Sequence, residues 1–310
     1  MVRIDGQFTM NTIQPKLTIE LLNSWLEDHK ALPMFPSVIT RLDEVLNDAN
    51  VSVELVTAVL ETDIGVVARI MKTVNSAKYV VHSPVQNLEE AVRRLGFSTV
   101  RMLACAASFM NMMSAPKTFS ERVFWRNAFV TAVAARELVL LMQKRGTELD
   151  ISTAFTLGLA HDLGIFLLDS CCADRYGDVA LLARDNPIAL ARIEQQELGI
   201  NHAIAGSILL RSWHFPEEWI MAVAGHHFPA RLPVTMQPWA DVLLAAENMS
   251  FYLGFNNGIC ASTPNVLSEL TELRLGSIGL NAIDFGQVAA RVRVLVNEEG
   301  WLSLADEMPA

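Results

Sequence analysis

Five of the seven histidines of this chain lie in one stretch: His161, His202, His214, His226 and His227. His161 is followed directly by Asp162 within the apolar run Gly158–Gly164, where we expect neither polar side chain to be buried without a partner. Imidazole and carboxylate groups are ligands of divalent transition metals, and a metal held by them can activate water for hydrolysis. The stretch is therefore the first place to look for chemistry.

Each of these side chains also has a structural interpretation. Adjacent residues of a helix diverge by about 100°, so His161 and Asp162 cannot chelate an ion as an i,i+4 pair does, although both can reach an ion over one flank. They can equally form hydrogen bonds in the core. His202 lies at the start of an expected helix, where capping would explain it, and His226 and His227 end another, where imidazoles suit the last carbonyls.

Helices must position these residues, because apolar side chains recur at helical spacing almost everywhere and no segment alternates with a period of two. The fold class is therefore predicted to be all-α. Six short helices are expected first, over residues 17–25, 38–46, 53–61, 64–74, 88–95 and 98–112. Further helices are expected over residues 121–143, 152–168, 176–183, 190–198, 203–212, 217–226, 239–253, 265–274 and 283–297.

The links between these helices indicate the domain organisation. The two prolines of Leu32–Pro36 prevent the first helix from continuing, and Ser37 is expected to cap the second, as Asp63 caps the fourth. Helices become longer after residue 116. We expect a tail over residues 1–16, an N-terminal helical subdomain over 17–115, a second helical subdomain over 116–254 and a C-terminal helical extension over 255–310.

The composition excludes several classes of protein. Hydrophobic residues make up 51% and charged residues 19%, which argues against disorder. The mean hydropathy is +0.29, but charged residues interrupt every apolar run before about 20 residues, so no membrane association is expected. The N-terminus lacks the apolar segment of a signal peptide, which predicts a cytoplasmic protein. The four cysteines form no Cys-x-x-Cys pair and are expected to be reduced core thiols.

The charge is unevenly distributed along the chain. Residues 1–150 carry 16 basic and 16 acidic residues, whereas residues 151–310 carry 8 and 18 and have no lysine. Nucleic acid requires a basic face to neutralise its phosphates. Nucleic acid is therefore not an expected partner.

Motifs along about 200 residues resemble, in order, the signatures of the HDOD family, the HD-related output domain. They are Leu32–Pro36, Asp63 with Asn75–Tyr79, Ala91–Gly96, Gly158–Gly164, Glu197 with His202, and Trp213–Pro216 with His226–Pro229. The resemblance covers roughly residues 20–250. It implies that the N-terminal helical subdomain packs on a bundle similar to that of HD-domain phosphohydrolases.

The resemblance also implies a set of metal-site positions. Catalytic HD proteins hold divalent metal with a first histidine, a His-Asp pair and a later aspartate, and the related HD-GYP phosphodiesterases add further histidines. Matched by position, the pair is His161 and Asp162, the later aspartate is Asp241, and the additional histidines are His202, His226 and His227.

This sequence departs from the HD pattern at two positions. Asn127 stands where the first histidine is expected, and an amide is a poor ligand for transition metals. If helix 121–143 packs beside the His161-Asp162 segment, Asn127 points into the same pocket. Ile165 stands where HD-GYP enzymes have a lysine, and it cannot offset phosphate charge. We therefore expect a degenerate metal site and no bound cofactor. The alternative is that the site binds a divalent metal, Fe, Mn, Ni or Mg.

The resemblance and the incomplete ligand set together predict a non-catalytic cytoplasmic module of bacterial signal transduction. It would act through contacts with signalling proteins on other chains. Two alternatives stay open. One is a metal-dependent phosphohydrolase or phosphodiesterase that uses the positions matched above as its ligands. The other is a sensor that binds a nucleotide without hydrolysing it.

Overall fold

The computed structural model describes residues 16–28, 35–75, 84–113, 115–184, 190–260 and 275–298, together with residue 302. Within these ranges every regular element is helical, which confirms the expected all-α class. The expected helix 265–274, the tail before residue 16 and most of the segments Leu32–Pro36 and Asn75–Tyr79 lie outside the described residues.

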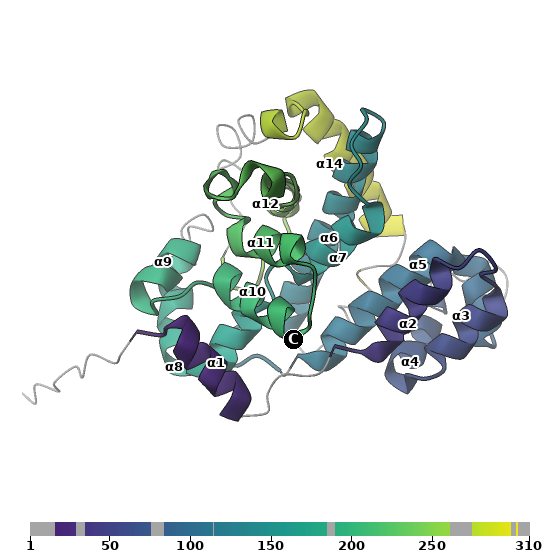
Figure 1. Cartoon of the computed structure of the whole chain (residues 1–310), viewed down its shortest axis with the longest axis horizontal. Coiled ribbons are helices and arrows are strands. Elements are labelled where there is room, and N and C mark those ends of the chain that lie inside the picture. Colours follow the sequence, from purple (N-terminus) through teal and green to yellow (C-terminus); the bar gives the residue numbers. More distant parts are fainter. Residues whose placement is uncertain are drawn as a thin grey trace, which may run out of the picture.

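Four helices form one end of the molecule (Figure 1): α2 (Ser37–Leu46), α3 (Val53–Leu60), α4 (Ile64–Val74) and α5 (Leu88–Met112). Helix α5 contains a break at Gly96, whose φ of 77° is open to glycine but costly for other residues. The two helices expected on either side of residue 96 are therefore the two limbs of α5.

Helix α1 (Ile19–Asp28) is placed differently from the expected bundle of six short helices. It lies beside α10, away from α2, α3 and α4 (Figure 1). Its apolar stripe, Leu22 and Leu26, is buried there, and the Leu17 amide donates a hydrogen bond to the Leu198 carbonyl at 2.6 Å. The sequence identified the stripe but not the surface that covers it.

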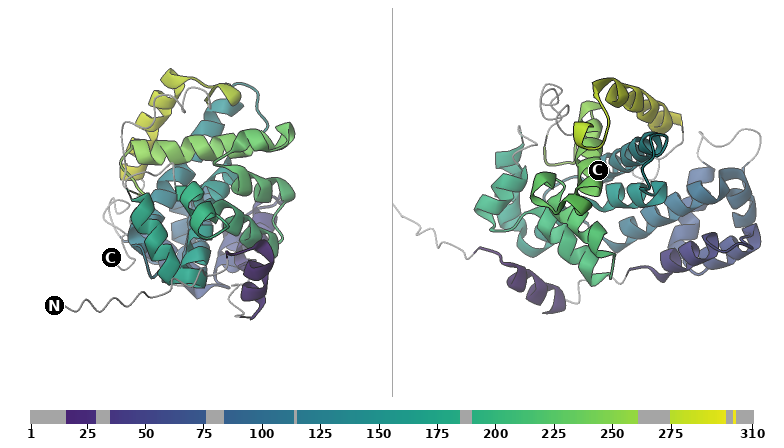
Figure 2. Two further views of the ribbon diagram at one scale, coloured as in Figure 1. Left: turned by 90° about the vertical axis from the view of Figure 1, so that its left-hand side faces the viewer. Right: turned by 45° about the horizontal axis from the view of Figure 1, so that its top comes forward.

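The centre of the molecule is a second group of helices, seen from two sides in Figure 2. It comprises α6 (Glu121–Gln143), α7 (Ile151–Ala160), α8 (Gly164–Ala183), α9 (Leu190–Glu197), α10 (His202–Ser212), α11 (Glu217–Gly225) and α12 (Gln237–Tyr252). The short 3-10 turns η2 (Pro229–Arg231) and η3 (Val234–Met236) join α11 to α12. Helix α6 is the central element and packs against α7, α12 and the C-terminal α14 (Ala282–Glu298).

The expected continuous helix over residues 152–168 is wrong. Helix α7 ends at Ala160, a turn covers residues 161–163, and α8 begins at Gly164. Helix α8 then runs to Ala183 through a non-helical residue, Cys172, and so includes the segment expected as a separate helix over 176–183. Apolar periodicity runs on through residues 161–163, so it cannot reveal this turn.

Side-chain caps start most of the helices whose beginnings are described. Asp63 accepts a hydrogen bond from the Val66 amide at 3.1 Å and caps α4, as expected. Ser37 does not cap α2: it is the first residue of that helix, and Pro36 occupies the cap position without a side-chain hydrogen bond. Further capping side chains are those of Ser52, Asn87, Ser120, Asp150 and Asn201.

An aromatic cluster joins the N-terminal helices to the central ones. The ring of Phe35 lies 4.9 Å from Phe215, 6.0 Å from Trp213 and 6.2 Å from Phe109, measured between centroids. Trp213 and Phe215 belong to the α10–α11 connection, whereas Phe109 belongs to α5. Phe35, at the end of the Leu32–Pro36 link, therefore packs on the central helices as well as on α5.

One stretch of the described chain, Ile151–Ala183, is long and apolar enough by composition to cross a membrane, and 89% of its most apolar window is buried against other parts of the protein. The four cysteines are free. Cys105 and Cys260 are buried as expected of core thiols, but Cys171 and Cys172 are only half-buried.

Candidate metal centre

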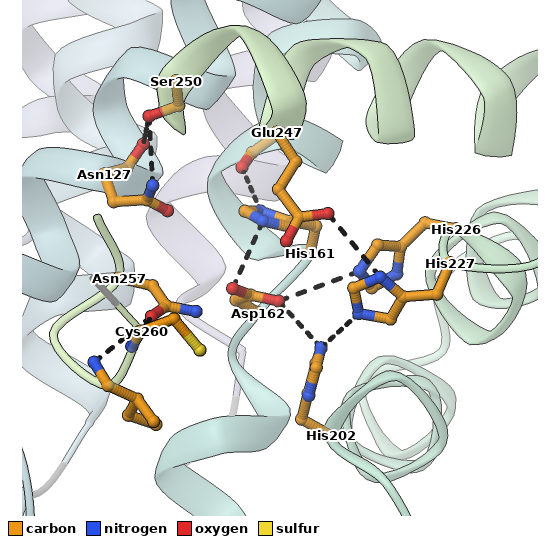
Figure 3. A network of polar contacts seen from close by, with 12 residues as sticks. Asn127, His161, Asp162, His202, His226, His227, Glu247, Ser250, Asn257 and Cys260 are labelled. Carbon is orange, nitrogen blue, oxygen red and sulfur yellow. Dashed lines mark hydrogen bonds and ion pairs between the residues drawn. The ribbon is translucent and has the colours of Figure 1, made fainter. Parts of the chain in front are cut away.

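Four segments that are distant in sequence bring histidine and carboxylate side chains together (Figure 3). The α7–α8 turn contributes His161 and Asp162, and the first turn of α10 contributes His202. The end of α11 contributes His226 and His227, and α12 contributes Glu247. We call these six residues the histidine cluster. Their ligand atoms fall into two overlapping groups, each within 4.8 Å: Asp162, His202, His226 and His227; and His161, Asp162 and Glu247.

Glycines allow these segments to approach closely. A Cβ atom on Gly164 would lie 1.9 Å from the His202 carbonyl oxygen and 2.4 Å from the Gly206 amide nitrogen. On the other side of the turn, a Cβ on Gly158 would lie 2.6 Å from the Ala132 Cα of α6. Backbone contact at Gly164, the first residue of α8, therefore sets the His161-Asp162 turn against the start of α10.

Backbone carbonyls orient two of the imidazoles. The Nδ1 of His161 donates to the Gly158 carbonyl at 2.8 Å, and the Nδ1 of His226 donates to the Val223 carbonyl at 2.7 Å. Each ring therefore presents an unprotonated Nε2, 3.4 Å (His161) and 3.8 Å (His226) from Asp162 oxygens. Metal-binding histidines are oriented by such hydrogen bonds at the other ring nitrogen.

A buried carboxylate orients His202. Glu194 on α9 accepts hydrogen bonds from the His202 amide at 2.8 Å, from His202 Nδ1 at 2.6 Å and from the Tyr176 hydroxyl at 2.7 Å. The Nε2 of His202 then lies 3.2 Å from Asp162 and 2.6 Å from His227 Nε2. The motif comparison pairs His202 with Glu197, but Glu197 is exposed, and the residue that holds His202 is Glu194, one turn earlier.

Helix α12 contributes a different carboxylate from the one matched by position. Glu247 lies with the cluster, its Oε2 3.7 Å from His227 Nδ1. Asp241 is buried on the same helix but belongs to neither group of ligand atoms. The two acids are six positions apart on α12, and the motif match assigned Asp241. The structure selects Glu247.

Asn127 is buried on α6, but its amide is directed toward other partners. Its Nδ2 donates to Ser250 Oγ at 3.0 Å and to the Phe255 carbonyl at 2.9 Å. Ser250 lies on α12, one turn beyond Glu247. Asn127 thus lies beside α12, the helix that carries Glu247, as expected for a residue near the pocket. Its amide, however, is bonded to Ser250 and Phe255 and does not face the histidines.

Unsatisfied polar atoms at the centre of the cluster fit a divalent cation. His161 Nε2, His226 Nε2 and both oxygens of Asp162 are buried and lack hydrogen-bond partners. Buried polar atoms without partners are rare in folded proteins and often mark an ion or water. Several imidazole nitrogens and two carboxylates match the preferences of Mn²⁺, Fe²⁺, Ni²⁺ or Zn²⁺. The residues present therefore fit a metal.

The charges of the cluster are strongly coupled. Burial alone would raise the pKa of Asp162, but the imidazoles of His161, His202 and His226 hold it well below its usual range. Burial likewise opposes the charged form of His202, but the carboxylates of Glu194 and Asp162 raise its pKa well above the usual value. Burial lowers the pKa of His226 to about 3. Burial, and to a lesser extent the negative charge of Asp162, raises the pKa of Glu247 to about 8.

Five of the six residues of the histidine cluster are buried, and the sixth, His227, is half-buried. His161 and His226 are 0% exposed, and Asp162 and His202 are 1% exposed. Three cavities, of about 970, 480 and 370 Å³, are lined by other residues of the described chain. Position 165, where HD-GYP enzymes carry a lysine after the pair, holds a fully buried isoleucine.

Comparison with known proteins identifies the fold and the family. A model of the HDOD domain matches residues 32–229. An uncharacterised protein of Treponema pallidum (strain Nichols) is 23% identical over 217 residues, which cover 70% of this chain and 41% of that protein. The chain thus spans less than half the length of this curated relative.

Crystal structures from three bacteria share the fold. An HDOD domain protein of unknown function from Geobacter sulfurreducens is 20% identical, with a TM-score of 0.69 over 94% of this chain and 99% of that one. A candidate phosphohydrolase from Shewanella amazonensis SB2B is 21% identical, with a TM-score of 0.68 over 93% and 98%. A candidate signal transduction protein from Marinobacter aquaeolei VT8 is 23% identical, with a TM-score of 0.72 over 96% and 63%.

Proposed function

This chain belongs to the HDOD family, and on that premise we propose that it is a signal-transduction module that holds a divalent metal ion in its core and does not hydrolyse a substrate. The observation that carries the proposal is the largely buried histidine cluster, with its oriented imidazoles and its unsatisfied nitrogen and oxygen atoms. The proposal replaces the expectation from sequence that no cofactor is bound.

The ligands would be drawn from His161, Asp162, His202, His226, His227 and Glu247. When bound, a divalent ion supplies positive charge and Lewis acidity beside Asp162 and Glu247. Around it, the chain orients the rings: Gly158 and Val223 carbonyls and the Glu194 carboxylate hold the outer nitrogens. Such outer hydrogen bonds fix the tautomer of a ligand and raise its basicity.

Three features argue against hydrolysis. His161, Asp162, His202 and His226 are at most 1% exposed, so an ion held among them would present little surface to a phosphodiester. The side chain at position 165 is an isoleucine and cannot neutralise a phosphate. Residues 151–310 carry 8 basic and 18 acidic residues, a balance that repels an anionic substrate.

A buried site can still transmit a signal, because its ligands come from four separate elements. Occupancy would fix the α7–α8 turn, α10, α11 and α12 relative to one another. The α10–α11 connection also carries Trp213 and Phe215, which contact Phe35 at the start of the N-terminal helices. The state of the cluster is thereby linked to the surface formed by α2–α5, which we propose is presented to signalling proteins on other chains.

A metal-dependent phosphohydrolase is the second candidate, favoured by the donor set itself. Mixed histidine and carboxylate ligands also build hydrolytic metal sites. The name of the Shewanella amazonensis relative describes that protein as a candidate phosphohydrolase.

An activity assay separates the two candidates. The purified chain is loaded in turn with Mn²⁺, Fe²⁺, Ni²⁺ and Mg²⁺ and incubated with bis-(p-nitrophenyl) phosphate and with cyclic dinucleotides. We expect no turnover above that of a His202→Ala variant prepared in the same way. Turnover that is lost in His202→Ala would establish the phosphohydrolase instead.

A further inference from the structure

A basic groove lies on the opposite side of α10 and α11 from the histidine cluster. It has a volume of about 970 Å³ and is bordered by α1, α9, α10, α11 and η2. Its lining contains three arginines, Arg192, Arg211 and Arg231, and no aspartate or glutamate. Residues 151–310 carry 8 basic and 18 acidic residues, so this concentration of positive charge is a local exception to the acidic character of that region.

Two of the arginines are held together without an acidic partner. Arg211 is neutralised by Glu217, with two contacts of 2.8 Å. Arg192 and Arg231 both lie over the ring of Phe228, at 5.8 and 4.6 Å from its centroid, and neither forms an ion pair with a carboxylate of the described residues. Like charges gathered on one aromatic ring repel each other, and an anion placed between them would relieve that repulsion.

The rest of the groove suits the organic part of a small molecule. Ile204, Ile208 and Leu232 provide apolar surface, and Asn23 and Gln195 add amide groups that can donate and accept hydrogen bonds. The volume lies within the range of about 300–1,000 Å³ that is usual for small-molecule sites. Guanidinium groups recognise phosphate through paired hydrogen bonds.

We propose that this groove binds a phosphorylated small molecule of nucleotide size, with its phosphate groups at Arg192 and Arg231. The site is separate from the histidine cluster and does not depend on metal there. It adjoins the cluster through the backbone, because Phe228 follows His227 and Asn201, which caps α10, precedes His202. A ligand in the groove would therefore act directly on the segments that present His202 and His227.

The test is isothermal titration of the full chain with ATP, GTP, ADP, AMP and inorganic pyrophosphate. We expect at least one nucleotide to bind with a Kd below about 1 mM, and Arg192→Ala/Arg231→Ala to weaken binding by about 10-fold or more for each guanidinium removed. Both arginines are exposed, so the variant should fold, which an unchanged thermal midpoint would verify.

The matched control is Arg291→Ala/Arg293→Ala, which removes two exposed charges of the same acidic region from α14. This control should bind as the wild type does. Equal loss of affinity in both variants, or no binding of any probe at 5 mM, would overturn the proposal. Binding that survives in His202→Ala would show that the nucleotide does not sit on a metal in the cluster, so this result is independent of the proposed function.

Discussion

Glu194 is the residue on which the orientation of His202 depends. Its carboxylate accepts from the His202 amide and from Nδ1, at 2.8 and 2.6 Å, within a site that is fully buried. Glu194→Gln keeps the shape but removes the negative charge opposite Nδ1. We expect metal affinity, measured by competition with a chelating dye, to fall by about 10–100-fold.

The matched control is Glu197→Gln on the same helix. Glu197 is exposed, and its side chain has no role in the cluster, so metal affinity should stay at the wild-type value. If Glu194→Gln and Glu197→Gln bind metal equally well, Glu194 is only a structural partner of Tyr176 and His202.

A substitution at Asn127 tests the opposite effect, because it adds a metal ligand whereas Glu194→Gln weakens one. Position 127 adjoins α12 one turn from Glu247, so an imidazole there is expected to join the cluster. Asn127→His should raise the affinity for Mn²⁺, Fe²⁺ or Ni²⁺ by about 10-fold or more. Isothermal titration measures it.

Asn127→Ala is the better control for this change than Arg126→His, because Arg126 is half-buried and lies 5.8 Å from the Phe255 ring centroid. Alanine removes the hydrogen bonds to Ser250 and Phe255 and adds no ligand. An affinity of Asn127→His no higher than that of Asn127→Ala would mean that residue 127 does not reach the cluster.

The sequence identified most of the cluster but could not identify its glutamates. His161, Asp162, His202, His226 and His227 are found by type and motif order, and the structure brings them together. Glu194 and Glu247 are ordinary helical glutamates by sequence. The only signal for either is a charged residue on a face that is otherwise apolar, and helical phase over several turns is too imprecise to separate Glu247 from Asp241.

At the scale of elements, the crossing of α8 and α10 sets the geometry of the cluster. The Gly164 position leaves no room for a methyl group, because a Cβ would lie 1.9 Å from a backbone carbonyl oxygen. Gly164→Ala must therefore move α8 away from α10. We expect a loss of about 2–4 kcal/mol in the free energy of unfolding, measured by urea denaturation, together with weaker metal binding.

Gly177→Ala in the same helix provides the comparison. A Cβ there would meet only the Thr118 methyl group, at an ordinary 3.8 Å. Because alanine is favoured over glycine inside a helix, this variant should gain about 0.5–1 kcal/mol. Similar effects of the two substitutions would show that the close crossing does not position the turn.

Most helices were predictable because their ends carry local signals. Helix α6 begins and ends at the expected residues, Glu121 and Gln143, and Asp63 caps α4. The errors arise where tertiary contacts decide. The break at residues 161–163 follows from the backbone contact of Gly164 with α10, and the place of α1 follows from the surface that covers Leu22 and Leu26. Neither contact can be predicted from the spacing of apolar residues along the sequence.

At the scale of the whole molecule, Phe35 connects the two groups of helices. Its ring contacts Phe109 on one side and Trp213 and Phe215 on the other. Phe35→Ala should lower the free energy of unfolding by about 2 kcal/mol, less than for a fully buried phenylalanine because the ring is half-buried. Thermal or urea denaturation measures the loss.

Tyr252→Ala is a suitable control, since Tyr252 is 46% exposed and contacts Phe285 instead. It should cost clearly less stability than Phe35→Ala. Unchanged stability in Phe35→Ala would mean that this aromatic cluster does not couple the N-terminal helices to the segments that carry His202 and His226.

The most direct test of the account is the metal content of the purified chain, determined by inductively coupled plasma mass spectrometry after dialysis against a weak chelator. The wild type and His214→Ala, in which an exposed histidine outside the cluster is removed, should each retain about one equivalent of a divalent transition metal. Asp162→Ala, which removes the carboxylate at the centre of the cluster, should retain less than about a tenth of that amount. A wild-type protein without stoichiometric metal, or an Asp162→Ala variant that keeps it, would contradict the account.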